Sequence, residues 1–138
     1  MANKNDSRNE ALVKQIEAKE KALIKPVVQF RTNCSLELFG CKKNLNVCRI
    51  DELILIKVQL NTMVLSAKDM GITADEVKIG GYSMTDWISD VDAKIEMAKY
   101  NEAKTKLTQM KTNLNKLLSE DRRTEIALDA VEETLNNM

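Results

Sequence analysis

The sequence contains no histidine, and this absence narrows the chemistry that is open to the chain. Histidine is the usual base beside a nucleophilic serine or cysteine, and it is a common ligand of zinc. A phosphate-binding glycine loop is also missing, because Gly80-Gly81 has neither the spacing nor the lysine that such a loop requires. We therefore predict that the protein is not an enzyme and that it has no catalytic residues, no metal and no cofactor.

Proline, glycine and aromatic residues are scarce, with one proline, four glycines and 4% aromatics among 138 residues. Few helix breakers indicate long helices. The formal net charge is zero, so no overall field attracts nucleic acid or a membrane. The most apolar window, Leu53–Leu60, is far shorter than the roughly 20 residues that cross a bilayer. Residues 1–9 are polar and unlike a signal peptide, so the expected location is cytoplasmic.

The three cysteines, Cys34, Cys41 and Cys48, are evenly spaced along the N-terminal half. Zinc-binding cysteines usually come in pairs about two to four residues apart, which these do not. Their odd number and the expected cytoplasmic location favour free thiols in a reducing compartment.

Two helices are predicted in the N-terminal half. Ser7 and Glu10 form a capping box that would start the first helix, and Pro26 would end it. Asp51 would cap the second helix, and Gly71 would close it. The apolar residues of the second helix fall on several of its faces, so we expect it to be the buried centre of the fold. These residues are Leu53, Ile54, Leu55, Ile56, Val58, Leu60, Met63, Val64, Leu65, Ala67 and Met70.

A β-hairpin is predicted between these helices. Apolar and polar residues alternate from Phe30 to Leu38, and the alternation resumes at Leu45 and Val47. The segment 40–43 contains glycine and is expected to be the turn. A lone pair of strands is marginally stable in water, so helices must cover it.

The C-terminal third predicts a helix that is too long for a small domain to bury. Ser83 and Asp86 form a capping box, and no glycine or proline follows before Leu118. A helix over residues 84–118 would be about 52 Å long at roughly 1.5 Å per residue, against a domain breadth of ~30 Å. We therefore expect its apolar stripe to bind a second copy or another protein. The predicted interface residues are Ile88, Val91, Ile95, Leu107, Met110, Leu114, Leu117, Leu128, Val131 and Leu135.

Two arrangements are open for the region after Leu118. Leu128, Val131 and Leu135 keep the heptad phase of the preceding helix, which is typical of a single coiled-coil rod. The serine and acids at 119–121 resemble a new helix start, which would give a hairpin bent at Ser119. A run of charge follows the apolar pair at 117–118, and this favours the bend.

A DNA-binding regulator is the alternative function. Four residues have the relative positions of the helix-turn-helix signature: Ala67, Gly71, Ile72 and Val77. The recognition helix would then be residues 74–79. It would last under two turns and would present Asp75 and Glu76, which repel phosphate. We therefore regard nucleic-acid binding as the weaker hypothesis.

Two further groups of side chains precede or open the long helix. Tyr82 and Trp87 are possible contact anchors for a partner, although filling the joint between helices is the favoured interpretation. Asp86, Asp90 and Glu96 share a helix flank and would bind Mg²⁺ only if a second acidic helix faced them. Solvated acids near a helix N-terminus are the favoured interpretation, because they complement the helix dipole.

The sequence thus predicts a mainly α fold with one β-hairpin, divided into a compact part (residues 1–81) and a coiled-coil-like arm (residues 82–138). The expected function is non-catalytic protein–protein interaction, as an oligomeric inhibitor, adaptor or assembly factor. A bacterial or bacteriophage source is expected from the general impression of the Asn, Lys and Met usage, and not from any single motif. An antiparallel homodimer through the arm is the first expectation, because the acidic and lysine-rich halves of the helix would face each other. A protein target is expected, and no membrane.

Overall fold

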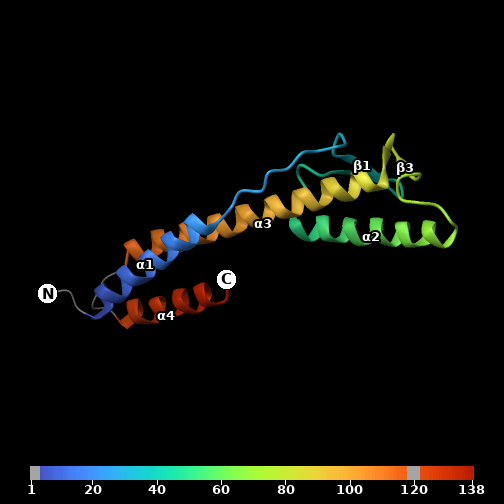
Figure 1. Cartoon of the computed structure of the whole chain (residues 1–138). Coiled ribbons are helices and arrows are strands. Elements are labelled where there is room, and N and C mark those ends of the chain that lie inside the picture. The colour runs from blue at the N-terminus through green and yellow to red at the C-terminus, as the bar shows by residue number, and fades with distance from the viewer. Residues whose placement is uncertain (1–3, 118–121) are drawn as a thin grey trace. The chain divides into compact units, whose positions relative to one another are not determined.

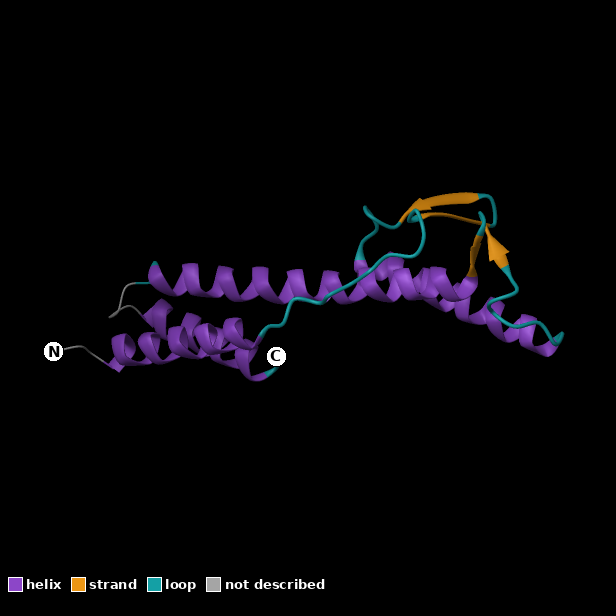
Figure 2. Cartoon of the chain, turned by 45° about the horizontal axis from the view of Figure 1, so that its top comes forward, coloured by secondary structure: helices purple, strands orange, loops and turns teal. Residues whose placement is uncertain are grey.

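The computed structural model describes residues 4–117 and 122–138, and these ranges contain four helices and two short β-hairpins (Figure 1). The predicted fold class, mainly α with a small hairpin and a long helix, is confirmed. Figure 2 shows how little of the chain is strand. The helices are α1 (Lys4–Ala22), α2 (Ile50–Asp69), α3 (Met84–Asn115) and α4 (Arg122–Asn136). The strands are β1 (Ser35–Leu38), β2 (Cys41–Asn44), β3 (Lys78–Ile79) and β4 (Tyr82–Ser83).

The chain forms two compact units that differ from the predicted division at residues 81 and 82. The terminal unit comprises Met1–Ile24 and Asn101–Met138, and the central unit comprises Lys25–Tyr100. The difference arises because α1, at the start of the sequence, packs against α4, near its end. The predicted bend at Ser119 lies outside the described residues, but α3 and α4 are separate helices rather than one rod.

The terminal unit is built from α1, the second half of α3, and α4. Its core contains one apolar stripe from each helix. Arg8 of α1 forms ion pairs with two acids of α4, Asp129 and Glu132, the latter at 2.6 Å. On the other flank of α1, the Lys111 ammonium lies 3.3 Å from the Glu17 carboxylate. The core residues are Leu12, Ile16, Leu107, Met110, Leu114, Leu128 and Leu135.

The central unit packs α2 and the first half of α3 together with the first hairpin. One face of α2, which includes Leu53, Ile56 and Leu60, is buried in this core. Strand β1 contributes Leu36 and Leu38, whereas every residue of β2 is exposed. The prediction that α2 is the buried centre of the fold is therefore wrong, since Leu55, Val58 and Leu65 are left exposed by the described residues.

The first hairpin turns earlier than the sequence suggested. Strands β1 and β2 are antiparallel, with Leu38 opposite Cys41, so the connection is the two residues Phe39 and Gly40. Both have positive φ, 51° and 77°. Positive φ at both positions is the requirement of the type I′ turn, whose twist matches that of the strands. The predicted turn at 40–43 failed because phenylalanine rarely occupies such a position.

The segment after α2 does not form the expected recognition helix. Gly71, with φ 76°, ends α2 in a Schellman motif, in which the Ile72 N–H donates to the Ala67 carbonyl at 2.9 Å. Residues 74–76 form a turn, and residues 78 and 79 form β3. The geometry of a helix-turn-helix is therefore not formed here.

Helix α3 begins as predicted and contributes to both cores. The Asp86 N–H donates to the Ser83 hydroxyl at 3.2 Å, which satisfies one of the free donors of the first turn. The helix has 32 residues and ends at Asn115, three residues before the expected Leu118. Ile95 is its last buried residue in the core of the central unit, and Leu107 is its first in the core of the terminal unit. In contrast, α1 begins at Lys4, so Ser7 lies within that helix and does not start it.

Candidate protein-binding surface

The stripe that was predicted to need a partner is covered by the chain itself. The expectation that it stays exposed is wrong, because α1 supplies a third helix in the terminal unit, and α2 and the hairpin cover the stripe in the central unit. The buried members are Val91, Ile95, Leu107, Met110, Leu114, Leu128 and Leu135. Ile88, Leu117 and Val131 are partly buried against the same cores.

The aromatic pair at the start of α3 serves packing. Trp87 is fully buried, and its indole Nε1–H donates to the Ile79 carbonyl at 2.8 Å. Tyr82 is half-buried and meets the Trp87 ring edge-on, with ring centroids 5.6 Å apart. Trp87 is therefore not a contact anchor for a partner, since no part of it reaches the surface.

Asp90, one of the acids considered for Mg²⁺, points inward and fixes the entry to the hairpin. Its carboxylate accepts hydrogen bonds from the Arg31 N–H at 2.8 Å and from the Thr32 N–H and hydroxyl at 2.8 and 2.5 Å. Asp86 instead pairs with the Arg31 guanidinium at 3.8 Å, and Glu96 is exposed. Within residues 4–117 and 122–138, no group of three or more His, Cys, Asp or Glu could hold a metal ion.

The surface that does lack cover lies on α2, opposite its buried face. We call Ile54, Leu55, Val58, Thr62 and Leu65 the outer face of α2; all five are exposed. Leu55, Val58 and Leu65 keep 59%, 55% and 63% of their areas in solvent. The Thr62 hydroxyl donates to the Val58 carbonyl of its own helix at 2.9 Å, so it needs no other partner.

Charge is almost absent around this face. Between Leu53 and Ala67 the sequence has a single charged residue, Lys57. Its ammonium pairs with Asp92 of α3 at 2.7 Å. Gln59, Asn61 and Ser66 supply neutral polar groups beside the apolar residues. An exposed apolar surface without charge resembles the centre of a protein interface more than ordinary protein surface.

The turn of the first hairpin borders the outer face. Phe39 has 79% of its area exposed and lines two apolar hollows in the central unit. The hollow toward the start of α2 has a volume of about 230 Å³ and also contains Leu38, Leu55 and Gln59. The hollow toward the end of α2 has a volume of about 430 Å³ and reaches Met70. A large exposed aromatic ring in a strained turn is an outlier that favours a functional explanation.

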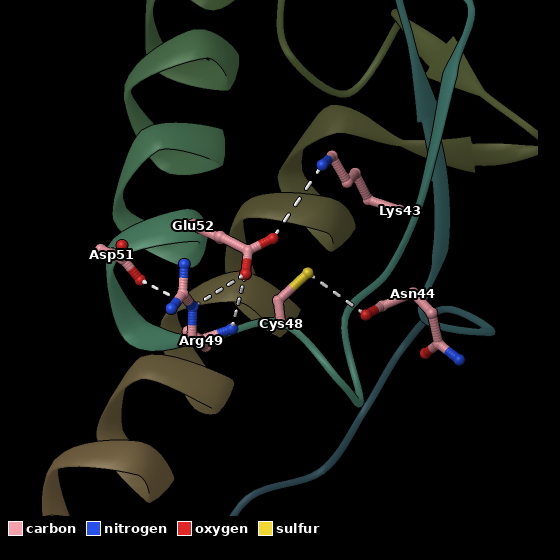
Figure 3. A network of polar contacts seen from close by, with 6 residues as sticks. All are labelled: Lys43, Asn44, Cys48, Arg49, Asp51 and Glu52. Carbon is pink, nitrogen blue, oxygen red and sulfur yellow. Dashed lines mark hydrogen bonds and ion pairs between the residues drawn. The ribbon is translucent and has the colours of Figure 1, made fainter.

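A network of polar side chains lies beside the exposed apolar surface at the start of α2 (Figure 3). The Glu52 carboxylate lies 3.9 Å from the Lys43 ammonium and 3.4 Å from Arg49 Nε, and Arg49 also lies 3.8 Å from Asp51. The Cys48 thiol donates to the Asn44 carbonyl at 3.2 Å. Burial raises the pKa of the Cys48 thiol, and the negative charge of Glu52 raises it further.

The four apolar residues of the outer face, Ile54, Leu55, Val58 and Leu65, were predicted from the sequence to be interior, whereas Thr62 was not singled out. Residues 51, 55, 58, 62, 65 and 69 alternate in steps of four and three, separately from the series 53, 56, 60, 63 and 67, which is buried apart from partly buried Met63. Two stripes on one helix signal two packed faces. The described part of the chain covers the inner face of α2 and leaves the outer face exposed.

Comparison of the chain with protein-family models, curated proteins and solved structures gives no significant match. None of the helices in the described ranges is long and apolar enough to cross a membrane. The fold and the exposed surface are therefore the basis for assigning a function.

Proposed function

We propose that the chain is a non-catalytic protein–protein interaction module that binds its partner through the outer face of α2 and the neighbouring Phe39 turn. The observation that carries the proposal is the exposure of Leu55, Val58 and Leu65 on a helix segment almost free of charge. Contiguous exposed apolar patches on soluble proteins mark interaction sites. Covering each half-exposed leucine would contribute roughly 1 kcal/mol to binding.

Phe39 fits the role of an anchor at the border of this surface. Aromatic residues carry much of the energy of protein interfaces because one ring excludes water over a large area. The two hollows beside Phe39 would receive side chains of the partner. An inhibitor, an adaptor or an assembly factor would each use such a surface.

Photo-crosslinking in the native cells tests the proposal. A photoreactive amino acid at Val58 should give a discrete protein adduct, and the same group at exposed Asn46 should give none. The adduct should disappear when Leu55→Gln and Leu65→Gln are added, because these changes remove the apolar contacts without burying a polar group. If Val58 gives no adduct, or if the adduct survives the two substitutions, the proposed surface is wrong.

A further inference from the structure

We infer that the partner presents an extended segment, which adds as a third strand beside β2 with an acidic residue opposite Lys42 and an apolar side chain over Leu55. This inference rests on the proposed function and names the chemistry of the occupant. Three features carry it: the free backbone edge of β2, the apolar hollow between β2 and α2, and the charge of Lys42. Addition of a strand to an exposed sheet edge is a recurrent mode of peptide recognition.

The hydrogen-bond pattern of the first hairpin points the backbone groups of Lys42 away from β1. The Leu45 N–H donates to the Cys34 carbonyl at 2.8 Å, so these two residues form a hydrogen-bonded pair. Hydrogen-bonded and non-hydrogen-bonded pairs alternate along an antiparallel ladder. In the register of this hairpin, Glu37 and Lys42 are therefore a non-hydrogen-bonded pair, and their N–H and C=O groups face outward. Among the described residues no third strand pairs with β2, so its outer edge is free.

The free edge is short, and it is centred on Lys42. The next outward-facing carbonyl of β2 belongs to Asn44, and it accepts from the Val47 N–H at 3.1 Å and from the Cys48 thiol at 3.2 Å. The turn that follows β2 thus occupies the edge at this end. In an antiparallel third strand, the residue opposite Lys42 would exchange two backbone hydrogen bonds with it.

The apolar hollow toward the start of α2 lies beside this edge. Lys43 points from β2 toward Glu52 of α2, so the strand and the helix face each other here (Figure 3). Successive side chains of a strand point to opposite faces, so the neighbours of the residue opposite Lys42 would lie on the face of Cys41 and Lys43. An apolar side chain opposite Cys41 would enter the hollow. The lining from β2 and α2 includes Cys41, Lys43, Leu55, Ile56 and Gln59.

The charge of Lys42 selects the kind of strand that this edge accepts. Lys42 is exposed and, unlike Lys43 with Glu52, forms no ion pair within the described part of the chain. Lysine on an edge strand opposes the addition of an apolar or basic strand. An Asp or Glu directly opposite would instead form a favourable cross-strand pair. The expected ligand is therefore an extended segment in which an acidic residue is followed by an apolar one.

Titration of the full chain with a synthetic peptide tests strand addition. The probe is the acetylated and amidated heptapeptide Ser-Thr-Ile-Glu-Leu-Thr-Ser, and the backbone amide signals of the isotope-labelled chain report binding. At millimolar peptide, saturable shifts centred on Lys42 and Leu55 are expected. An absence of such shifts would overturn the inference.

Two N-methylated forms of the heptapeptide distinguish an added strand from a bound helix. Methylation at the glutamate nitrogen should abolish binding, because this N–H would donate to the Lys42 carbonyl. The matched control is methylation at the leucine nitrogen, whose N–H would point away from β2, and it should weaken binding no more than about twofold. A helix would bond its own backbone groups and make no use of the strand edge. Equal sensitivity to the two methylations would therefore refute strand addition.

A charge exchange tests the register at Lys42. The heptapeptide with lysine in place of glutamate should bind at least about threefold more weakly at low salt, and Lys42→Glu should restore its binding. Lys42→Gln should bind both peptides alike, and the amide spectrum of each variant shows whether the hairpin is intact. The control is Lys104→Glu, the same change of charge at an exposed position of the terminal unit, which should leave the preference for the glutamate peptide unchanged. No recovery in Lys42→Glu would refute the register.

The Val58 adduct separates failure of this inference from failure of the proposed function. A protein adduct at Val58, together with no binding of the heptapeptide, keeps the interaction surface but overturns the extended segment as its occupant. A protein adduct that is lost when the heptapeptide is added in excess supports both. The absence of any adduct overturns both.

Discussion

Two apolar helix stripes of similar spacing differ in their burial: one is covered by the chain and the other is exposed. The stripe on α3 and α4 is buried by helices of the same chain, with Leu107, Leu114 and Leu128 at 0–1% exposure. The stripe on the outer face of α2 stays more than half exposed at Leu55, Val58 and Leu65. Periodicity alone does not distinguish these cases, since both stripes have the three-and-four spacing of a packed helix.

The two stripes differ in burial because one has another element of the chain packed on it and the other does not. In the terminal unit, α1 brings Leu12 and Ile16 from the start of the chain to cover the stripe. In the central unit, the inner face of α2 is covered by α3 and by the buried residues of β1, and among the described residues no such element covers the outer face. Long apolar helices therefore indicate a partner only after the rest of the chain has been placed.

The largest difference in unfolding free energy should appear when one leucine of the buried stripe and one leucine of the exposed stripe are each replaced by alanine. Leu114→Ala in the terminal unit should cost about 2–5 kcal/mol of unfolding free energy, because it leaves a cavity at a site 1% exposed. Leu55→Ala in the outer face should cost no more than about 0.5 kcal/mol, because solvent already surrounds much of the side chain. Guanidinium unfolding followed by circular dichroism measures both. Equal losses would show that the outer face is part of the folding core.

The next largest effect should come from the buried carboxylate of the central unit. Asp90→Asn replaces two acceptor oxygens by one and points an NH₂ group at the donors of Arg31 or Thr32. We expect a loss of about 1–3 kcal/mol in unfolding free energy. Asp92→Asn is the matched control, because Asp92 pairs with Lys57 near the surface and should cost under about 1 kcal/mol. If the control costs as much as Asp90→Asn, the buried hydrogen bonds do not account for the loss.

The Phe39 turn should show a smaller effect of opposite sign. Phe39→Asn should raise stability by about 1 kcal/mol, because asparagine tolerates the left-handed conformation better than phenylalanine. The same change should weaken the Val58 adduct, since it removes the proposed anchor. Gly40→Ala is the control for the turn: it should lower the melting temperature because its φ is +77°, although a Cβ would meet no atom within 4 Å. A fall in stability for Phe39→Asn would show that the ring packs rather than binds.

The smallest effect concerns the Cys48 thiol at the edge of this surface. Its pKa is raised in the folded state, so this group favours folding at pH values below the unfolded thiol pKa, and that contribution is lost as pH rises through the folded pKa. Glu52→Gln should lower the pKa of Cys48, and Lys43→Gln should raise it further. The pH profile of iodoacetamide labelling, read peptide by peptide with exposed Cys41 as the internal reference, measures the shift. If the labelling profile of Glu52→Gln is unchanged, the charge of Glu52 does not contribute to the raised pKa of Cys48, and burial alone accounts for it.

Much of the fold follows from spacing and end signals in the sequence. The three-and-four pattern from Leu53 to Ala67, with Gly71 after it, gives the course of α2 and its end, but the predicted start is wrong, because Arg49 is the N-cap and Asp51 lies inside the first turn. The pairing of α1 with α4 does not follow, because the thin apolar edge of Leu12 and Ile16 does not specify which distant helix it covers. The hairpin turn was placed wrongly because Phe39 has a positive φ, at a turn position where Gly, Asn or Asp is usual.

The candidate surface is marked in the sequence by two features of α2, an excess of apolar residues and a scarcity of charge. Burial depends on which faces the first hairpin and α3 cover, and periodicity does not contain that information. The charge-free run between Leu53 and Ala67, broken only by Lys57, was the stronger signal, since a helix face that meets only water rarely lacks charge over several turns.

The contribution of α3 to two cores has a consequence for how this helix opens. All residues from Glu96 to Lys106 are described, and none of their side chains is buried. Helical segments of this length gain little stability from their own backbone hydrogen bonds. Amide protons in the middle of α3 should therefore exchange with deuterium before those near Val91 or Leu107, so that the helix opens between its two buried segments before it opens within either of them.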